Sequence, residues 1–259
     1  MQKTIIDLQQ ALEQKANLAT KAWWEKYLKH VIPFRGVKMA DIRQVVHSSF
    51  KSEPVQEMSH EQLKSLALAL ICQQHSEDKL AGILFIQEIL IPNDMLNWRS
   101  DLQRFASLFD DGYIFDWNIC DWFCIRALGP LFQREGQECA QAIAAWRTAE
   151  NLWRRRAAAI AFVNFAAKGE ANFPGFTETI LNVCAHTVKS SERFAQTGVG
   201  WILRELSVAD KDAVLHFINN NFANFSFEGL RSASKKMTEN EKSELLERKK
   251  RDSLTRQTT

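Results

Sequence analysis

Apolar side chains recur at every third or fourth position along most of the chain, the spacing that places them on one face of an α-helix. We therefore predict an all-α protein in which short, Gly- or Pro-containing connections make consecutive helices antiparallel neighbours. The predicted helices span residues 2–15, 18–31, 38–51, 57–74, 77–91, 95–108, 116–132, 137–149, 152–168, 174–187, 191–206, 209–221 and 227–248.

Three of these helices resemble one another weakly, which predicts a repeat. They carry DWFCIRALGPLF, WRRRAAAIAFVNFA and QTGVGWILRELS at offsets of about 40 to 45 residues, the period of two-helix HEAT or armadillo units. Stacked pairs of this kind form an α-α superhelix, or solenoid, whose inner helices line one concave surface. We predict a single HEAT-like repeat domain over residues 1–231; a compact helical bundle is the alternative.

Composition and charge narrow the class of protein. The chain holds 10 Gly and 5 Pro, too few for the many tight turns of an all-β fold. Its net charge of +2 means that a polyanionic partner would need basic residues gathered on one face. Residues 232–259 are rich in Lys, Glu, Ser and Thr and are expected to form a charged helical extension and tail, partly disordered.

The cysteines and the amino-terminal segment predict an intracellular protein. The five Cys follow no zinc-ligand spacing, so we expect buried, reduced thiols and no metal site. The first residues, MQKTIIDLQQALEQKANLAT, have neither signal-peptide nor transit-peptide character. No apolar run approaches the length of a membrane span, so no membrane partner is expected.

Trp117 and Asp121 are the most informative pair in the chain. They stand four residues apart in IFDWNICDWFCIRALGPLF and therefore share one helix face with Cys124, Ile125 and Leu128. A carboxylate on an apolar face is costly to bury unless a partner neutralises it. Either a basic group pairs with Asp121, or the face opens on a cleft where a negative charge beside an indole ring is used.

A run of three cations begins the helix in NLWRRRAAAIAFVNFA. Asn151 is a plausible N-cap, so Arg154, Arg155 and Arg156 fall in the first turns, where they oppose the helix dipole. Arg156 also shares a sector with the apolar stripe of this helix. A nearby anion would resolve both conflicts, and it could be a phosphate or the carboxylate of Asp121.

Trp201 lies opposite the apolar stripe of its own helix. In ERFAQTGVGWILREL that stripe is formed by Val199, Ile202, Leu203 and Leu206, and Arg204 shares the sector of Trp201. The indole therefore packs on an adjacent repeat or faces the concave surface, where it can stack or meet a cation. The Gly-Val-Gly before Trp201 indicates close helix packing; no phosphate-binding glycine loop, HExxH or GxSxG motif is found.

Taken together, these segments resemble the AlkD-type DNA alkylation repair glycosylases, which are built from HEAT-like repeats. The likeness runs from about Tyr27 to Leu206, through YLKHVIPFRGVKMADIRQVV, WNICD, NLWRRRAA and GVGWILREL. Asn118 stands where the family motif has an acidic residue. The resemblance implies an enzyme that binds double-stranded DNA along its concave face and hydrolyses the N-glycosidic bond of positively charged N-alkylated purines, such as 3-methyladenine or 7-methylguanine.

The resemblance also assigns residues. It places four side chains around the lesion in the catalytic site, and these are Trp117, Asp121, Arg156 and Trp201. Tyr27 and Arg43 match positions that in the family lie near DNA, and Lys38, also a candidate for DNA binding, stands in a turn where the family has other residues. Arg154 and Arg204 are further candidates for DNA binding, as cations that could meet phosphates. The resemblance implies a monofunctional glycosylase that needs no cofactor and no metal, acts as a monomer, and works in the cytoplasm, near the nucleoid in a bacterial cell.

Two other functions fit the same scaffold. The first is a non-catalytic protein that binds DNA structure through its surface cations, with an affinity that falls steeply with salt. The second is a HEAT-type protein-interaction module, in which Asp121 and Arg156 would form a structural ion pair. Release of a base from alkylated DNA separates the enzyme from both alternatives.

Overall fold

A computed structural model describes residues 1–255 of the chain, with side chains up to residue 252, and every regular element in this part is a helix. The chain forms two compact units, the N-terminal unit of residues 1–131 and the C-terminal unit of residues 132–259. Both consist of helices packed in antiparallel pairs, so the predicted all-α architecture is confirmed. Within residues 1–255, no helix combines the length and the apolar character needed to cross a membrane.

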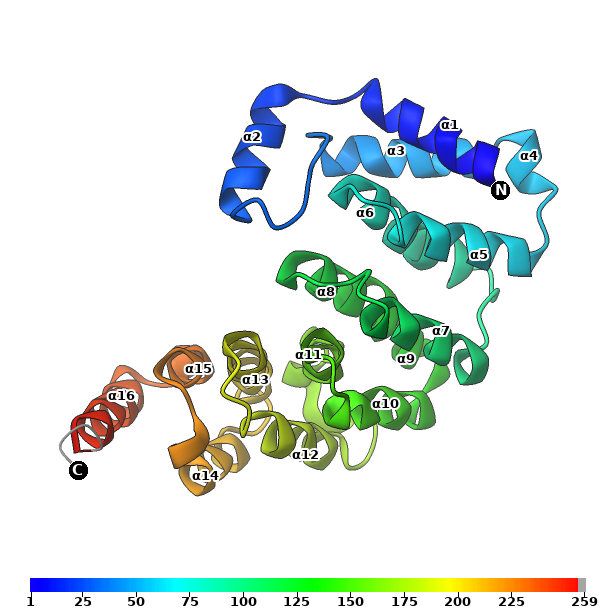
Figure 1. Cartoon of the computed structure of the whole chain (residues 1–259). Coiled ribbons are helices and arrows are strands. Elements are labelled where there is room, and N and C mark those ends of the chain that lie inside the picture. Colours follow the sequence, from blue (N-terminus) through cyan, green and yellow to red (C-terminus); the bar gives the residue numbers. More distant parts are fainter. Residues whose placement is uncertain (256–259) are drawn as a thin grey trace. The chain divides into compact units, whose positions relative to one another are not determined.

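The N-terminal unit stacks α1, α3, α5 and α6, and α8 against one another, with α2 to one side (Figure 1). Helix α1 lies on α3, α5 pairs with α6, and α6 also contacts α3 and α8. Its elements are α1 (Gln2–Glu13), α2 (Leu18–Tyr27), α3 (Met39–Phe50), α4 (Glu53–Gln56), α5 (His60–Ile71), α6 (Ser76–Phe85), η1 (Ile86–Leu90), α7 (Trp98–Asp110), α8 (Trp117–Phe123), η2 (Cys124–Leu128) and the start of α9 (Gly129–Glu135).

Helices α6 and α2 differ in how much of their surface is buried. Every residue of α6 is buried, including the charged side chains Glu77, Asp78 and Lys79, whereas no residue of α2 is buried. The core around α6 is filled by aromatic rings such as Phe85, which lies edge-on to Phe50 with 6.0 Å between the ring centroids. A buried aromatic side chain of this kind stabilises a fold by about 1.5–3 kcal/mol.

The C-terminal unit is a pair of helix layers (Figure 1). Helices α11, α13 and α15 contact one another in series and form one layer, while α10, α12 and α14 form the other. Its elements are α10 (Gln137–Ala144), η3 (Ala145–Thr148), α11 (Leu152–Ile160), η4 (Ala166–Ala171), α12 (Phe176–Thr187), α13 (Arg193–Leu206), α14 (Lys211–Asn220), η5 (Phe222–Asn224), α15 (Phe227–Ala233), η6 (Ser234–Lys236) and α16 (Glu239–Thr255).

Glycines let α13 and α15 approach closely. A Cβ atom on Gly200 would lie 2.4 Å from the carbonyl oxygen of Gly229, a distance that backbone atoms cannot tolerate. The predicted packing role of the Gly-Val-Gly segment is therefore confirmed. The close approach also fixes which residues of α15 can lie beside α13.

Several predicted helix ends were wrong, among them those of α2, α11 and the last helix. Helix α2 ends at Tyr27 because Lys29 and His30 adopt positive φ angles, and the His30 N–H donates to the carbonyl of Glu25 in a helix-terminating bond of 2.7 Å. Helix α11 ends at Ile160, not at residue 168. The predicted helix 227–248 is broken after η6, and α16 begins anew.

The start of α16 is set by a capping box. The Thr238 hydroxyl accepts the Glu241 N–H at 3.3 Å, while the Glu241 carboxylate accepts the Thr238 N–H at 2.9 Å. The expected charged extension is therefore a helix up to Thr255. The tail of residues 232–259 was predicted to be partly disordered, and its residues 256–259 lie outside the described residues.

Candidate active site and nucleic-acid interface

Helix α8 presents the Trp117–Asp121 pair one turn apart, as the sequence predicts. Asp116 caps the helix: its Oδ1 accepts the N–H groups of Asn118 at 2.8 Å and Ile119 at 3.1 Å. Trp117 is half-buried, whereas Asp121 is 8% exposed and so lies deeper than a carboxylate in an open channel would. The cap fixes the first turn of α8 and hence the direction of both side chains.

The helix carrying Asp121 changes its hydrogen-bond pattern directly after α8. The π-helical turn η2 spans Cys124–Leu128, where the sequence predicts continuous α-helix. Cys124 and Leu128, which share the face of Trp117 and Asp121, are fully buried. A π-turn inserts an extra residue, re-aims the side chains on either side of it, and is frequent at functional sites.

Aromatic rings of α2 meet Trp117. Tyr27 lies edge-on to Trp117 with 5.9 Å between ring centroids, and it stacks on Trp23 at 5.2 Å with an interplanar angle of 10°. Tyr27 is 54% exposed and Trp23 is also exposed, so this row of rings faces solvent. The structure thus brings together two residues that the sequence assigned separately to DNA binding and to catalysis.

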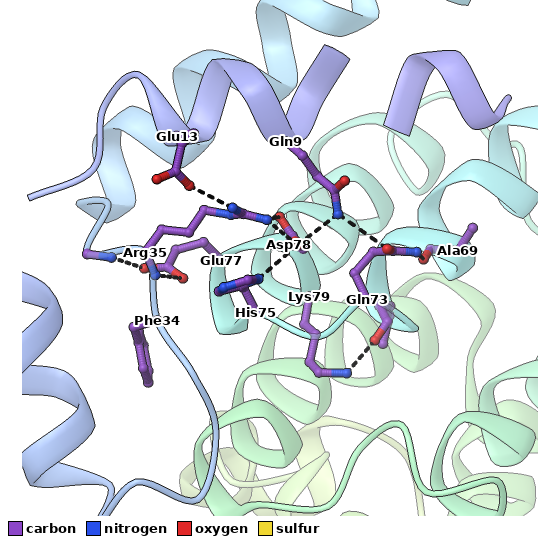
Figure 2. A network of polar contacts seen from close by, with 12 residues as sticks. Gln9, Glu13, Phe34, Arg35, Ala69, Gln73, His75, Glu77, Asp78 and Lys79 are labelled. Atoms are coloured by element: carbon purple, nitrogen blue, oxygen red, sulfur yellow. Dashed lines mark hydrogen bonds and ion pairs between the residues drawn. The ribbon is translucent and has the colours of Figure 1, made fainter. Parts of the chain in front are cut away.

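Buried acids hold the loop that follows α2 (Figure 2). The Glu77 carboxylate accepts three consecutive backbone N–H groups, from Arg35 at 2.9 Å, Gly36 at 2.7 Å and Val37 at 3.1 Å. The Arg35 guanidinium in turn donates to Asp78 at 2.9 Å and to Glu13 at 2.7 Å. Sequence analysis missed this network, whose only signal is the charged start of an otherwise apolar helix.

A buried lysine lies beside the cap of α8. The Lys79 Nζ donates to the carbonyl oxygens of Ile71 at 2.8 Å and Tyr113 at 2.9 Å, and burial lowers the pKa of its ammonium group. Burial also raises the pKa of Asp116; its two helix-capping hydrogen bonds and Lys79 counteract this, and the charge of Asp121 adds to it. The candidate acid, Asp121, therefore interacts electrostatically with the buried carboxyl of Asp116, which in turn interacts with the Lys79 ammonium group.

Two predicted DNA-binding cations lie on or before α3. Lys38 is exposed at the N-cap of α3. The Arg43 Nε donates to Glu88 at 2.7 Å, and the His47 Nε2 lies 2.7 Å from the other oxygen of that carboxylate. Burial alone would raise the pKa of Glu88, but the bonds from Arg43 and His47 outweigh it and lower that pKa. Arg43 is thus held by an acid, whereas Lys38 extends into solvent.

In the C-terminal unit, Arg156 is placed by α11 and held by α13. Asn151 caps α11 as predicted, through bonds from Trp153 N–H and Arg154 N–H to its Oδ1. The buried Arg156 Nη1 donates to the Phe194 carbonyl at 2.8 Å and to the Thr197 hydroxyl at 3.3 Å.

The other predicted residues of this unit lie beside aromatic rings. The Arg154 guanidinium lies over the Trp146 ring at 5.3 Å. Trp201 is half-buried with its Arg204 neighbour 5.8 Å over the ring, and the predicted core stripe of α13 is fully buried. Arg204 also donates to Glu205 at 2.8 Å. Trp201 therefore has a cation of its own helix, Arg204, over one face of its ring.

A polar cavity of about 400 Å³ lies between α13 and α15. Thr197, Glu228, Arg231, Ser232 and Lys235 line it, and Thr197 is the residue that also binds Arg156. Arg231 and Lys235 are exposed and make no ion pair with any described residue. They were not predicted from the sequence, because Arg231 lies on α15 and Lys235 on η6, and the position of these segments beside Thr197 depends on the glycine contact of α13 and α15.

The predicted lesion-contacting residues divide equally between the units. Trp117 and Asp121 belong to the N-terminal unit, with Tyr27 beside them, and Arg156 and Trp201 belong to the C-terminal unit. Within residues 1–255 no group of three or more His, Cys, Asp or Glu side chains is arranged to hold a metal ion.

Comparison with known proteins identifies the family. A sequence profile of the family described as DNA alkylation repair enzyme matches residues 8–237. The chain belongs to this family. Its assigned role is therefore in DNA alkylation repair, with DNA as the partner. Helix α16 lies beyond the matched residues, and no curated protein matches the chain significantly.

A solved structure shows the same fold. It is described as a predicted DNA alkylation repair enzyme from Enterococcus faecalis, and it superimposes with a TM-score of 0.72 over 87% of this chain and 98% of that one. The two sequences are 18% identical. The likeness to this repair-family structure confirms the arrangement of stacked helix pairs.

Proposed function

We propose that the chain is a monofunctional DNA glycosylase that hydrolyses the N-glycosidic bond of positively charged N-alkylated purines in double-stranded DNA. The observation that carries this proposal is the Trp117–Asp121 pair, presented on a capped helix in a member of the DNA alkylation repair family. Such a base carries a delocalised positive charge, so its bond to the sugar is already weakened. The enzyme then needs only to stabilise the cation that forms.

Asp121 is the proposed catalytic carboxylate. Cleavage passes through an oxocarbenium-like sugar, and a fixed carboxylate near that cation stabilises it without reorganisation. Asp121 would also position or deprotonate the attacking water. Its low exposure supports this role, because a carboxylate shielded from water interacts more strongly with a transient charge. Trp117 and Trp201 would contact the lesion nucleotide and its deoxyribose through their ring faces.

Arg156 is proposed to bind the phosphate next to the lesion. Its guanidinium is oriented by the Phe194 carbonyl and the Thr197 hydroxyl, which limits its freedom before DNA arrives. The polar cavity beside Thr197 extends this interaction to Arg231 and Lys235, which we propose bind the following phosphates of the same strand. The remaining predicted contacts, from Tyr27, Lys38, Arg43, Arg154 and Arg204, stay proposals of the same kind.

The substrate supplies its own leaving-group activation, so the proposed reaction needs no metal, nucleotide or redox cofactor. No lysine occupies a proposed lesion-site position, which supports base release without strand cleavage. Action as an intracellular monomer also belongs to this proposal.

Base release from alkylated duplex DNA tests the proposal. Wild-type protein in excess over DNA containing 7-methylguanine should release the free base, and Asp121→Asn should slow release by about 10²- to 10³-fold because one preorganised charge is lost. Asp111→Asn, at an exposed position of the same unit, is the matched control and should act as wild type. Equal rates for Asp121→Asn and wild type would remove Asp121 from the chemistry.

A non-catalytic DNA-binding function is the second candidate. The exposed Arg231 and Lys235 at a polar cavity favour it, since they would bind duplex DNA whether or not α8 performs chemistry. Salt-sensitive DNA binding without base release from several alkylated substrates would support this candidate. Absence of DNA binding at moderate salt would instead support a protein-interaction module.

A further inference from the structure

An exposed aromatic surface continues from the candidate site along α2. Trp117 meets Tyr27 edge-on and Tyr27 stacks on Trp23, so the three rings form one row. Trp23 is the last ring of this row and is 57% exposed. Helix α2 itself stands to one side of the stacked helices and buries none of its residues (Figure 1). Neighbouring exposed rings on a protein surface indicate a binding site, yet the proposed reaction gives Trp23 no role.

The Trp23 ring is held in one orientation before any ligand arrives. It lies edge-on to Trp24, with 4.8 Å between the ring centroids and an interplanar angle of 86°. Trp24 in turn stacks on the buried ring of Phe34 at 5.7 Å, with an interplanar angle of 8°. Tyr27 and Trp24 therefore fix the direction of the Trp23 ring, and much of its surface stays accessible. Binding to this ring orders no mobile side chain, which lowers the entropic cost.

The charges beside Trp23 suit a polyanionic partner. Lys26 follows Trp23 by three positions, so it shares the same side of α2, and it is exposed. Lys29, just beyond the end of the helix, is exposed as well. The acid of this segment, Glu25, lies 3.8 Å from the ammonium group of Lys21. A flat ring next to exposed cations can bind a base and its phosphate together.

We infer that Trp23 stacks on an unpaired base of the bound DNA, the base opposite an abasic site. Inside an intact duplex, neighbouring bases cover both faces of each base, so a ring can stack only on a base that has left the stack. Trp23 is two ring contacts away from Trp117, which is proposed to contact the lesion nucleotide. The base at Trp23 therefore belongs to another nucleotide.

The proposed reaction produces such a base in every turnover. Release of the alkylated purine leaves the opposite base without a pairing partner, while the neighbouring base pairs stay intact. Stacking on Trp23 would make the protein bind its abasic product more tightly than a paired duplex. The origin of the abasic site rests on the proposed function, whereas the stacking itself can be measured without catalysis.

Two duplexes of one sequence and three variants test the inference. One duplex is fully paired, and the other carries a tetrahydrofuran abasic-site analogue opposite 2-aminopurine, a fluorescent base whose emission falls when it stacks. Trp23→Leu keeps an apolar side chain but removes the ring, and Trp23→Phe keeps a ring. Leu18→Ala, at an exposed apolar position of α2, is the matched control. Fluorescence anisotropy measures affinity, and thermal unfolding confirms that each variant is folded.

We expect Trp23→Leu to bind the abasic duplex about tenfold more weakly than the wild type and the paired duplex equally well, because one stacking contact is lost. The emission of 2-aminopurine should be low in the complexes of wild type and Trp23→Phe, and higher in the complex of Trp23→Leu. Leu18→Ala should match the wild type in both measurements.

Three results would overturn the inference: wild-type protein that binds the two duplexes equally, an equal loss of affinity for both duplexes in Trp23→Leu, or equal emission of 2-aminopurine in the wild-type and Trp23→Leu complexes. Base release is measured separately on DNA containing 7-methylguanine. Wild-type protein that releases no base, but whose preference for the abasic duplex depends on Trp23, would contradict the proposed function and support the role of Trp23. Base release without any effect of Trp23→Leu would contradict that role alone.

Discussion

The charged side chains of α6 in the N-terminal unit and those that line the polar cavity in the C-terminal unit lie in opposite environments. In the N-terminal unit the charges of α6 are buried and bonded: Glu77 to backbone N–H groups, Asp78 to Arg35, and Lys79 to backbone carbonyls. In the C-terminal unit two cations, Arg231 on α15 and Lys235 on η6, are exposed at a polar cavity. Burial removes a charge from contact with DNA but lets it orient neighbouring backbone, whereas exposure leaves it available to phosphates.

This contrast predicts that the buried charges of α6 stabilise the fold and that the exposed cations at the polar cavity bind DNA. The buried charges of α6 hold the loop after α2 and the loop before α8, and the helices α2 and α8 carry the rings and the acid of the candidate site. Loss of these buried charges should lower the stability of the fold, and activity should fall as a consequence. The exposed cations Arg231 and Lys235 make no ion pair with any described residue, so the fold does not depend on them. Their loss should weaken DNA binding and leave the fold intact.

Replacing Glu77 by Ala should have the largest effect. Three backbone N–H groups would lose their acceptor in a buried loop, so we expect the free energy of unfolding to fall by about 3 kcal/mol or more. Urea unfolding measures this change. Glu57→Ala, which alters an exposed acid of the same unit, should leave the unfolding midpoint near the wild-type value. A stability loss below about 1 kcal/mol for Glu77→Ala would contradict the anchoring role.

Sequence patterns predicted the elements of the fold because helical periodicity is a local property. They also placed Asn151 at an N-cap and Val199 on the buried face of α13, both of which depend on neighbours along the chain. The Glu77 network was not predictable in this way. Its acceptor lies about 40 positions from its donors, and nothing in the periodicity of either segment pairs them.

In the candidate site, too, contacts between segments distant in sequence could not be predicted from local patterns. The spacing of Trp117 and Asp121 predicted their shared face, but the depth of Asp121, the π-turn after it and the contact with Tyr27 depend on how α2 and α6 pack on α8. Arg231 was overlooked for the same reason, since only the contact of α15 with α13 places it near Thr197.

Replacing Arg231 and Lys235 together by Ala tests the other half of the contrast. Each lost phosphate contact lowers the slope of log affinity against log salt by about 1, so we expect a slope change near 2 and an affinity loss on the order of tenfold at physiological salt. Fluorescence anisotropy with an unmodified duplex measures both quantities.

The control for this pair removes the same charge elsewhere in the unit. Lys168→Ala with Lys211→Ala changes two exposed lysines on η4 and α14. This control should keep most of the wild-type slope, and both double variants should unfold at the wild-type temperature. Equal loss of affinity in the two double variants would show that overall charge, not the cavity of α15, governs DNA binding.

Asp116→Asn should have the smallest effect, and its sign depends on pH. Burial raises the pKa of this carboxyl above 3.8 in the folded protein, so the native state holds the proton more tightly than the unfolded chain does. Stability therefore falls as pH rises from about 3.8 through the folded pKa. An amide keeps the helix cap, since its oxygen accepts the same N–H groups, but it carries no charge to bury.

At pH 7 the variant should accordingly equal or exceed the wild type in free energy of unfolding, by on the order of 1 kcal/mol, and the gain should vanish as pH approaches 3.8. Urea unfolding at a series of pH values measures the difference, with Asp111→Asn as the exposed control. A difference that grows on acidification would mean that Asp116 is stabilised as a carboxylate, by its capping hydrogen bonds and by Lys79, despite its burial.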